Sequence, residues 1–566
     1  MDKLPAHNPD SNMGDYNAAC RDFRWEEVLK NFEFSSTGRV NAAHEAVDRH
    51  VKTMGDRIAL RFLDDESEET YTFQELSLAS NRFANLLLEL GVNKKDRVFI
   101  FMPRSLELYI AFFGILKVGA IPVPLFEAFM REGLLDRMGD CDPVAVVTHE
   151  SLKERIPRDK VETLESVIVV GGTEENEIGF DEIKTKDSSF EPVWLDLDDP
   201  LLIHYTSGST GKPKGVLHAQ RAMIGHYQTG KWILDLNKDD NYWCTADPGW
   251  VTGTSYGIFA PLLNGVGTII RQGRFTAERW YETIERAKVT VWYTAPTALR
   301  LLMGEKEDTA SKFDLSSLRY ILSVGEPLNP EVIRWALKVY KQPIHDTWWM
   351  TETGMIMISN YPSMPIKPGS MGKPFPGVEA AIIDDNGKEL GVNEVGNLAL
   401  KKGWPSMMKE IWKREEKFKE YFIFDPWFIS GDSAYIDEDG YFHFHGRVDD
   451  VINTAGERVG PFEVESRLVE HPRVVEAAVI GKPDPVRGEI IKAFVVVRGI
   501  IEDREALCRE LIEFVKGGLA AHSAPREIEF IDTLPKTRSG KIMRRVLKAR
   551  ELGYDLGDRS GAGEGV

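Results

Sequence analysis

Apolar residues in this chain alternate between helix-like and strand-like spacing over most of its length. Residues 73–90 (FQELSLASNRFANLLLEL) place apolar side chains three and four positions apart, which predicts an amphipathic helix. The run 96–103 (DRVFIFMP) predicts a buried strand, and 106–119 (LELYIAFFGILKVG) predicts a second helix. Such alternation is typical of an α/β domain with largely parallel strands.

The same alternation continues through the middle of the chain. Further strand-like apolar runs occupy residues 120–125, 143–149, 166–171, 200–206, 265–272, 289–296 and 318–325. We therefore expect a large multilayer α/β body that holds two related α/β parts.

The pattern changes in the last third of the chain. Residues 427–446 (WFISGDSAYIDEDGYFHFHG) predict short hairpins, which we assign to a small β-barrel-like part of the large body. Short helix and strand patterns then follow one another to residue 532, as expected of a compact α+β unit. We predict an N-terminal domain over 1–448 and a small C-terminal domain over 449–566.

Size and charge narrow the class of protein. A chain of 566 residues exceeds one comfortable core, which agrees with two domains. Its formal net charge of −19 argues against broad binding of nucleic acid or anionic membranes. The cysteines are scattered without a C-x-x-C pair, so we expect reduced packing residues in a cytoplasmic protein: Cys20, Cys141, Cys244 and Cys508.

No stretch of the chain predicts membrane insertion. The first residues (MDKLPAHNPDSNMGDY) lack the apolar core of a signal peptide. The most apolar long run, 108–126, is interrupted by Lys117, glycines and prolines, which predicts a buried helix followed by a strand.

A loop rich in Gly, Ser, Thr and Lys follows the strand at 200–206. Such residues suit a phosphate, because glycine exposes backbone N–H groups and lysine supplies charge. The candidates are Thr206, Ser207, Gly208, Ser209, Thr210, Gly211, Lys212 and Lys214. Composition alone leaves an exposed hairpin loop equally open. A Walker A loop does not fit, because Thr206 stands at its first glycine position and Pro213 follows Lys212.

The whole loop resembles the phosphate-binding loop of the adenylate-forming acyl-CoA synthetases. The other motifs of that family occur in its order and spacing: VGEP (324–327), DTWWMTET (346–353), SGD (430–432), GRVDD (446–450), GERVGPFEVE (456–465) and PKTRSGKIMRR (535–545). The resemblance extends from about residue 30 to residue 550 and is strongest to the branch that activates acetate.

This resemblance implies a site for ATP or AMP. Besides the loop, the implied nucleotide contacts are Gly325, Glu326, Pro327, Asp346, Thr347, Trp348, Trp349, Met350 and Thr351. Asp432 would accept hydrogen bonds from the ribose hydroxyls, and Arg447 and Arg458 would bind phosphate oxygens. Taken singly, each of these charged residues would more often form a surface ion pair.

Lys541 occupies the family's catalytic lysine position. In the first step of that family a carboxylate attacks the α-phosphate of ATP, so two anions meet. At about 4 Å and an effective dielectric constant near 20, their repulsion is about 4 kcal/mol, and an ammonium group between them would offset much of it. Without the resemblance, Lys541 would be read as a solvated lysine in a basic run.

Magnesium is implied together with ATP, since a hard cation prefers oxygen ligands. Glu352 stands at the family's magnesium-linked carboxylate. A second implied metal position uses main-chain oxygens near Val469, His471 and Val474, although His471 is also consistent with a histidine at a helix end.

The second step of the family requires coenzyme A. Its thiol attacks the acyl-adenylate after the small domain rotates, and Asp449 lies where the hinge is expected. Lys516 stands at the position of the family's arginine near the CoA nucleotide.

The acyl pocket is expected to be short. Trp349 stands where relatives that use medium chains carry a small residue, and an indole there leaves room for two or three carbons. Val251, Thr252 and Val324 also match the acetate branch, whereas Met350 and Pro248 depart from it. The alternative for Trp349 is an ordinary core aromatic residue.

These features predict an AMP-forming acetate–CoA ligase with a mobile C-terminal domain. The first alternative is the same reaction with a longer, branched or cyclic acid. The others are a nucleotide-binding regulator without catalysis and a P-loop NTPase that releases ADP. PKTRSGK also resembles sites of lysine acetylation, which would make an acetyltransferase and a deacetylase partners at Lys541. Nucleic acid and membranes are not expected as partners.

Overall fold

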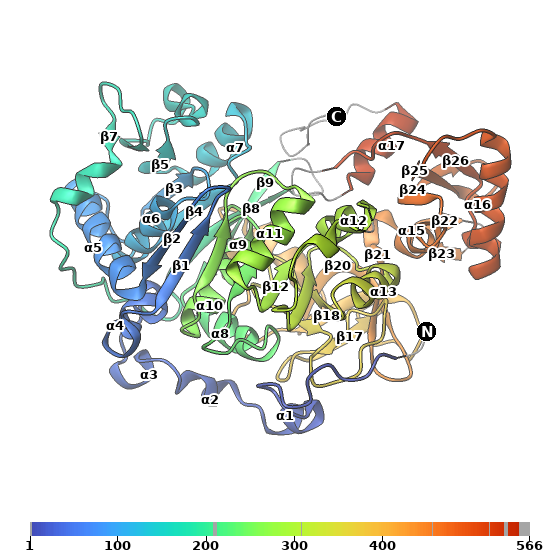
Figure 1. The fold of residues 1–566 in the computed structure, drawn as a ribbon, viewed down its shortest axis with the longest axis horizontal. Helices are drawn as coiled ribbons and strands as arrows, with labels where there is room; N and C mark the ends of the chain where they lie inside the picture. The colour runs from blue at the N-terminus through green and yellow to red at the C-terminus, as the bar shows by residue number, and fades with distance from the viewer. Residues whose placement is uncertain are drawn as a thin grey trace.

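The computed structural model describes residues 3–207, 212–306, 308–454, 457–519, 521–536 and 542–553. The chain forms a large N-terminal domain and a small C-terminal domain at one end of the molecule (Figure 1). The predicted fold class, an α/β body followed by a smaller α+β domain, is confirmed.

A five-stranded parallel sheet forms one layer of the large domain. Its strand order is β4 (Ile121–Leu125), β3 (Arg97–Phe101), β5 (Ala145–His149), β6 (Ser166–Val170) and β7 (Ile178–Gly179). Its inner strands are buried on both faces, which explains their continuous Val and Ile runs. The helix predicted at 73–90 is α5 (Phe73–Glu89), and it begins at a capping box in which Thr72 and Glu75 bond each other's backbone.

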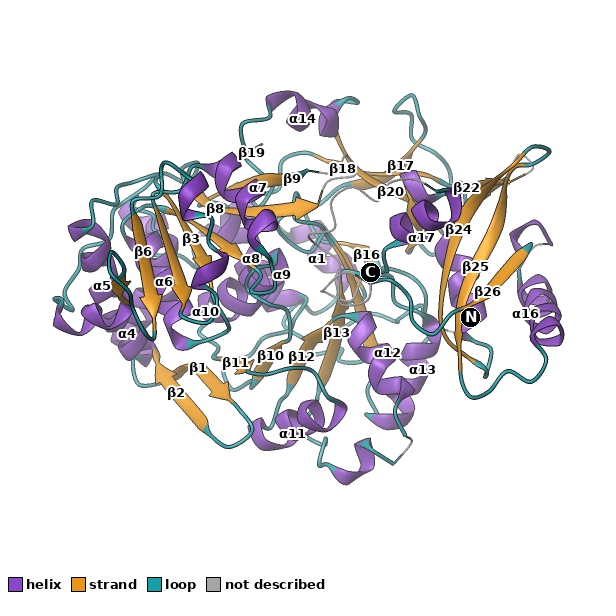
Figure 2. Ribbon diagram, turned by 90° about the horizontal axis from the view of Figure 1, so that it is seen from above, coloured by secondary structure: helices purple, strands orange, loops and turns teal. Residues whose placement is uncertain are grey.

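A nine-stranded sheet forms the second layer (Figure 2). Its order is β16 (Lys373–Pro374), β15 (Ile358–Ser359), β14 (Ile344–Trp348), β13 (Tyr320–Val324), β12 (Val291–Thr294), β10 (Tyr242–Cys244), β11 (Thr268–Arg271), β1 (Ile58–Leu63) and β2 (Glu68–Thr72). The strands from β14 to β1 run parallel to their neighbours, and the edge strands are antiparallel. Trp292 faces one hydrophobic cluster and the next residue, Tyr293, faces another, because successive strand residues point to opposite faces.

Helices cover both sheets. Besides α5, the longer ones of the large domain are α6 (Leu106–Lys117), α7 (Arg131–Cys141), α8 (Ala222–Trp232), α11 (Ala277–Ala287), α12 (Pro296–Gly304) and α13 (Pro330–Val339). The short ones are α1 (Tyr16–Asp22), α2 (Trp25–Leu29), α3 (Phe34–Thr37), α4 (Arg49–Met54), α9 (Val251–Thr254), α10 (Ala260–Leu263) and α14 (Glu415–Lys419). The π-helical turn η5 (Ser255–Phe259) joins α9 to α10.

Two antiparallel sheets complete the large domain. One contains β19 (Glu410–Ile411), β9 (Pro213–Ala219) and β8 (Pro200–Ser207). The other contains β17 (Ala380–Ile383), β18 (Gly396–Lys401), β20 (Trp427–Ile436) and β21 (Phe442–Arg447), and β20–β21 is the hairpin predicted at 427–446. The small β part predicted from the sequence is therefore a four-stranded antiparallel sheet.

The small domain begins after the turn η8 (Val448–Asp450), which contains Asp449. Its sheet consists of β23 (Glu457–Val459), β22 (Ile452–Thr454), β25 (Gly488–Val497), β24 (Val474–Asp484) and β26 (Glu527–Phe530). Its helices are α15 (Pro461–Val469), α16 (Arg504–Gly518) and α17 (Arg544–Leu552).

Two smaller predictions have different outcomes. The apolar run 108–126 forms the buried helix α6 and the strand β4, as predicted. Among the described residues, every helix is too short or too polar to span a lipid bilayer. The cysteines are free thiols, but Cys20 is exposed on α1, so the prediction of packing residues was wrong for it.

Candidate functional site

The motifs of the large domain meet at the carboxyl ends of β13 and β14. Val324 and Thr347 are paired residues of these parallel strands, so VGEP and DTWW leave the sheet side by side. Gly325 has φ +87°, a left-handed conformation that residues other than glycine rarely adopt. Side chains at this edge of an α/β sheet are well placed to bind a ligand.

Asp432 on β20 connects this edge to the antiparallel sheet. Its Oδ2 accepts a hydrogen bond from Trp348 Nε1 at 2.8 Å, and its Oδ1 accepts one from Arg447 Nη1 at 2.8 Å. Asp432 and Arg447 are directly opposite each other in the β20–β21 ladder. Burial alone would lower the pKa of Arg447, but the nearby carboxylates of Asp432 and Glu352 raise it.

Glu352 is a buried carboxylate with a cationic partner. Lys214 Nζ lies 2.7 Å from its Oε1, and Tyr421 Oη donates to the same oxygen at 2.8 Å. Burial by itself would raise the pKa of Glu352, but the charge and hydrogen bond of Lys214, helped by Tyr421, hold it below the usual value. The carboxylate is therefore ionised although little of it is exposed.

Glu326 is likewise fixed by buried partners. Its carboxylate accepts hydrogen bonds from Thr297 Oγ1 and lies 2.5 Å from Arg300 Nη2 on α12. Pro327 follows at the turn into α13, where Asn329 donates to Ser466 Oγ of the small domain at 2.8 Å. The VGEP segment is thus tied to α12 and lies near a contact between the two domains.

The rest of the DTWWMTET segment is positioned by buried polar contacts. Asp346 accepts a hydrogen bond from Ser323 Oγ at 2.7 Å, and burial raises the pKa of Asp346 to about 7. His218 Nε2 bonds the carbonyl oxygen of Thr351 at 2.9 Å, and burial lowers the pKa of His218 to about 4. A neutral imidazole donating from Nε2 satisfies this contact. Met350 is partly buried at the edge of the core.

Trp349 lies in the core beside two tyrosines. Its ring meets that of Tyr256 edge to face at 5.0 Å, and its Nε1 donates to Tyr293 Oη at 3.2 Å. Val324 belongs to the same hydrophobic cluster, Val251 packs against it, and Thr252 is partly buried on α9. Our reading of the sequence missed Tyr293, for which the only signal was an aromatic residue in the strand pattern VWYTAP.

The predicted phosphate loop connects β8 to β9. Thr206 on β8 is paired with Lys214 on β9, and Lys212 is exposed. The Oγ1 atom of Thr206 is buried and has no hydrogen-bond partner in the part of the chain that the structure describes. The residues predicted at the tip of the loop lie outside the described residues: Gly208, Ser209, Thr210 and Gly211.

The remaining site residues belong to the small domain. Lys541 lies outside the described residues. Arg458 is exposed on β23, and Lys516 on α16 bonds Glu513 of its own helix at 3.1 Å. Both figures place α17 toward the β8–β9 hairpin and α16 at the outer edge of the molecule (Figures 1 and 2).

The second predicted metal position lies at the end of α15. Val469 is the last residue of this helix, and the His471 carbonyl accepts the N–H of Val474, the first residue of β24, at 2.9 Å. The His471 ring lies 3.1 Å from Glu510 Oε1. No group of three or more His, Cys, Asp or Glu side chains suited to a metal occurs within the described ranges.

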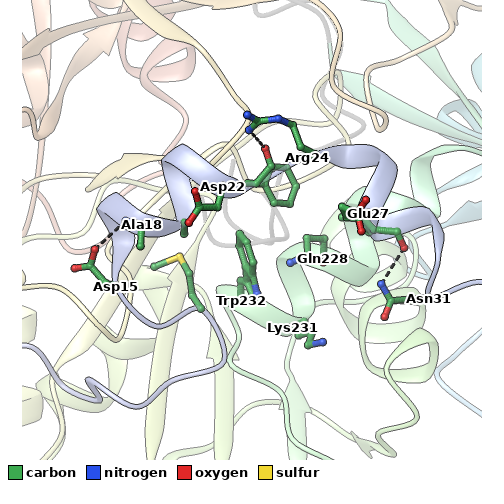
Figure 3. A pocket seen from close by; sticks show the side chains of 13 residues that line it. Asp15, Ala18, Asp22, Arg24, Glu27, Asn31, Gln228, Lys231 and Trp232 are labelled. Atoms are coloured by element: carbon green, nitrogen blue, oxygen red, sulfur yellow. Dashed lines mark hydrogen bonds between the residues drawn. The ribbon is translucent and has the colours of Figure 1, made fainter.

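A pocket of about 420 Å³ lies elsewhere, between α1, α2 and α8 (Figure 3). Its walls include Asp15, Asp22, Lys231 and Trp232, and none of the motif residues lines it. The charged contacts described above therefore indicate the functional site better than this hollow does.

Comparison with known proteins agrees with this arrangement. Residues 47–412 match the model of the AMP-binding enzyme family, and residues 463–541 match that of the AMP-binding enzyme C-terminal domain. The acetyl-coenzyme A synthetase of Bacillus subtilis (strain 168) is 60% identical over 563 residues, which cover 98% of each chain.

Solved structures of CoA ligases have the same fold. The anthranilate CoA ligase AuaEII in complex with anthranoyl-AMP has a TM-score of 0.85 and 32% identity, with 91% of this chain and 98% of that chain covered. A Brucella canis acyl-CoA synthetase has a TM-score of 0.75 and 37% identity, with 95% and 99% covered. The chain described here belongs to the AMP-binding enzyme family.

Proposed function

We propose that this protein is an AMP-forming acetate–CoA ligase. Acetate would react with ATP to give acetyl-adenylate and diphosphate, and the thiol of coenzyme A would then displace AMP to give acetyl-CoA. The observation that supports this most strongly is the 60% identity, over nearly the whole chain, to a protein named acetyl-coenzyme A synthetase.

The charged contacts around Asp432 and Glu352 would bind the nucleotide. Asp432 would accept hydrogen bonds from the ribose hydroxyls, with Arg447 and Trp348 fixing its carboxylate. Glu352 fits a Mg²⁺ ion, because it is an ionised, buried oxygen ligand. When bound with ATP, magnesium would shield the phosphate charges. Lys214 and Tyr421 would keep Glu352 ionised and oriented.

The small domain would supply the remaining groups in turn. We assign to Lys541 the stabilisation of the charge that builds up when acetate attacks the α-phosphate. Rotation about Asp449 would then remove this lysine and bring the segment of Arg458 toward the site for the reaction with CoA. Lys516 stays a candidate contact for the CoA nucleotide, and the carbonyls of Val469, His471 and Val474 stay candidate metal ligands.

Trp349 would limit the acid to two or three carbons. Its buried indole, together with Val251, Thr252 and Val324, would close the pocket that longer acids need. Discrimination would then rest on steric exclusion of longer chains.

Product analysis tests the proposal directly. The protein is incubated with acetate, ATP, Mg²⁺ and CoA, and we expect AMP, diphosphate and acetyl-CoA in equal amounts. Release of ADP would indicate an NTPase, and ATP binding without any product would indicate a regulator. A series of acids from acetate to valerate separates the acetate ligase from a ligase for longer or branched acids.

Lys541→Ala provides the matched variant for the first step. It should abolish formation of acetyl-adenylate but spare most thioester formation from supplied acetyl-adenylate. Equal loss in both half-reactions would contradict its assigned role.

Regulation and location complete the proposal. Acetylation of Lys541 by an acetyltransferase would neutralise its ammonium group and silence the first step, and a deacetylase would restore it. Recovery of activity on deacetylase treatment tests this. We place the enzyme in the cytoplasm, which cell fractionation would check.

A further inference from the structure

The indole of Trp349 is held by a chain of buried hydrogen bonds. Its Nε1 lies 3.2 Å from Tyr293 Oη, which lies 2.8 Å from Thr347 Oγ1. Thr347 Oγ1 in turn lies 2.7 Å from the carbonyl oxygen of Ser323. These bonds run from Trp349, just after β14, to Tyr293 on β12, back to Thr347 on β14 and then to Ser323 on β13, and so join three strands of one sheet.

The direction of each hydrogen bond in this chain is determined. A carbonyl oxygen only accepts, so the single hydroxyl proton of Thr347 points to Ser323. The Tyr293 hydroxyl must therefore donate to Thr347, which leaves its oxygen to accept from the indole. An indole N–H only donates, and Tyr293 provides its acceptor.

A second tyrosine, Tyr256, packs on the indole without a hydrogen bond to it. The Tyr256 ring packs edge to face on Trp349 at 5.0 Å, while its hydroxyl accepts the N–H of Ile356 at 2.6 Å. Tyr293 and Tyr256 are both fully buried, so neither ring has room to turn away. The Tyr293 hydroxyl satisfies the indole N–H in the observed orientation.

We propose that Tyr293 is a specificity-determining positioning residue, which fixes the Trp349 indole across the acyl pocket by accepting its N–H. This inference rests on the proposed function, because it assumes that Trp349 closes the pocket to longer acids. Two features would then select short acids: the size of the Trp349 indole and the hydrogen bond from its Nε1 to Tyr293.

Loss of the Tyr293 hydroxyl would leave a buried N–H without a partner. The indole would then turn to reach water or another acceptor, and the pocket would lose its fixed end wall. Longer acids should gain relative to acetate, although the tryptophan itself is still present.

A double-mutant cycle tests this proposal. The ratio of kcat/KM for butyrate to kcat/KM for acetate is measured for the wild type, Tyr293→Phe, Trp349→Phe and the double variant. We expect Tyr293→Phe to raise the ratio by about tenfold. The double variant should have the same ratio as Trp349→Phe alone, because phenylalanine has no N–H for Tyr293 to orient.

Tyr320→Phe is the matched control. Tyr320 lies fully buried on the neighbouring strand β13, and its hydroxyl has no hydrogen-bond partner among the residues that the structure describes. Its removal should leave the ratio of the two acids as in the wild type.

Two results would overturn the proposal. One is an equal loss of activity with both acids in Tyr293→Phe, which would indicate a merely structural role. The other is the same shift in both backgrounds, which would show that Tyr293 does not act through the indole.

Two further measurements complete the test. Should Tyr293→Phe fail to fold, Thr347→Val breaks the chain one bond further on and should raise the ratio about threefold, measured at saturating ATP. No shift in that variant would also overturn the proposal. A wild-type protein that forms no acetyl-CoA would refute the proposed function instead.

Discussion

Trp348 and Trp349 are consecutive residues, yet they belong to two chemically different halves of the site. The Trp348 indole donates to the carboxylate of Asp432, which also bonds the guanidinium of Arg447. The Trp349 indole donates to the neutral hydroxyl of Tyr293 and packs on Tyr256. One half is built from charges, and the other from neutral groups with fixed hydrogen bonds.

Under the proposed function, the two halves would recognise different parts of the substrates. A nucleotide with phosphates is polar and anionic, so ionised groups that are already paired and oriented suit it. A short acyl chain offers almost nothing to bond, so only the shape of a rigid wall can select it. We therefore expect changes in the first half to reduce catalysis and changes in the second to alter the choice of acid.

The largest effect should follow loss of the cation in the charged half. Lys214→Met leaves the carboxylate of Glu352 buried without its cationic partner, which should cost about 3–5 kcal/mol of stability. Formation of acetyl-adenylate should fall more than about 100-fold, the equivalent of some 3 kcal/mol. Calorimetric unfolding and diphosphate release measure the two effects. Tyr421→Phe, which removes one hydrogen bond from the same oxygen, should cost only about 1 kcal/mol.

Asp432→Asn tests ribose binding in the same half. It removes the charge that binds Arg447 and should raise the KM for ATP by about 10- to 100-fold, as expected for hydrogen bonds to a charged group. The KM for acetate should change far less. Asp385→Asn, at an exposed turn, is the control. A larger effect on acetate than on ATP would contradict the division of the site.

Trp349→Gly tests the neutral half. Opening the pocket should let valerate bury about three more methylenes than acetate, worth about 2.4 kcal/mol in kcat/KM. Assays over an acid series should show the preference move to medium chains with little change in the KM for ATP. An unchanged preference would mean that Trp349 is an ordinary core residue.

The last prediction concerns Asp346, which lies on the same strand as Trp348. Its folded-state pKa of about 7 exceeds the usual value, so the folded protein binds this proton more tightly than the unfolded chain does. Protonated Asp346 therefore stabilises the folded state at low pH, and this stabilisation is lost as the pH rises from about 4 to 7. Asparagine does not titrate, so the free energy of unfolding of Asp346→Asn should rise by about 2 kcal/mol relative to that of the wild type between pH 5.5 and pH 8. Thermal midpoints at the two pH values measure it, and a parallel shift at both would contradict the assignment.

Local patterns in the sequence predicted most elements of the fold. The helix at 73–90 was recognisable because its apolar spacing and the Thr72–Glu75 capping box are short-range signals. The hairpin at 427–446 was recognisable for a similar reason, since its Asp and Gly residues predict a turn. The antiparallel β8–β9 pairing agrees with the hairpin that composition left open, although the loop sequence alone did not decide between a plain hairpin and a phosphate loop.

The partners within the site could not be predicted in the same way. Nothing near Glu352 in the sequence indicates that Lys214 and Tyr421 bond its carboxylate. In the sequence, Tyr293 is one more aromatic residue in a strand pattern, and only the tertiary structure shows that its hydroxyl accepts the N–H of Trp349.

The sequence alone determined the class of fold, the order of its elements and the resemblance to a family of enzymes. These follow from periodicity, turn residues and motifs, which are properties of neighbouring residues. Which charge meets which carboxylate, and how the two tryptophans divide the site, depends on the folded arrangement. Such contacts join residues far apart in the chain, and their strength depends on burial, which exists only once the chain has folded.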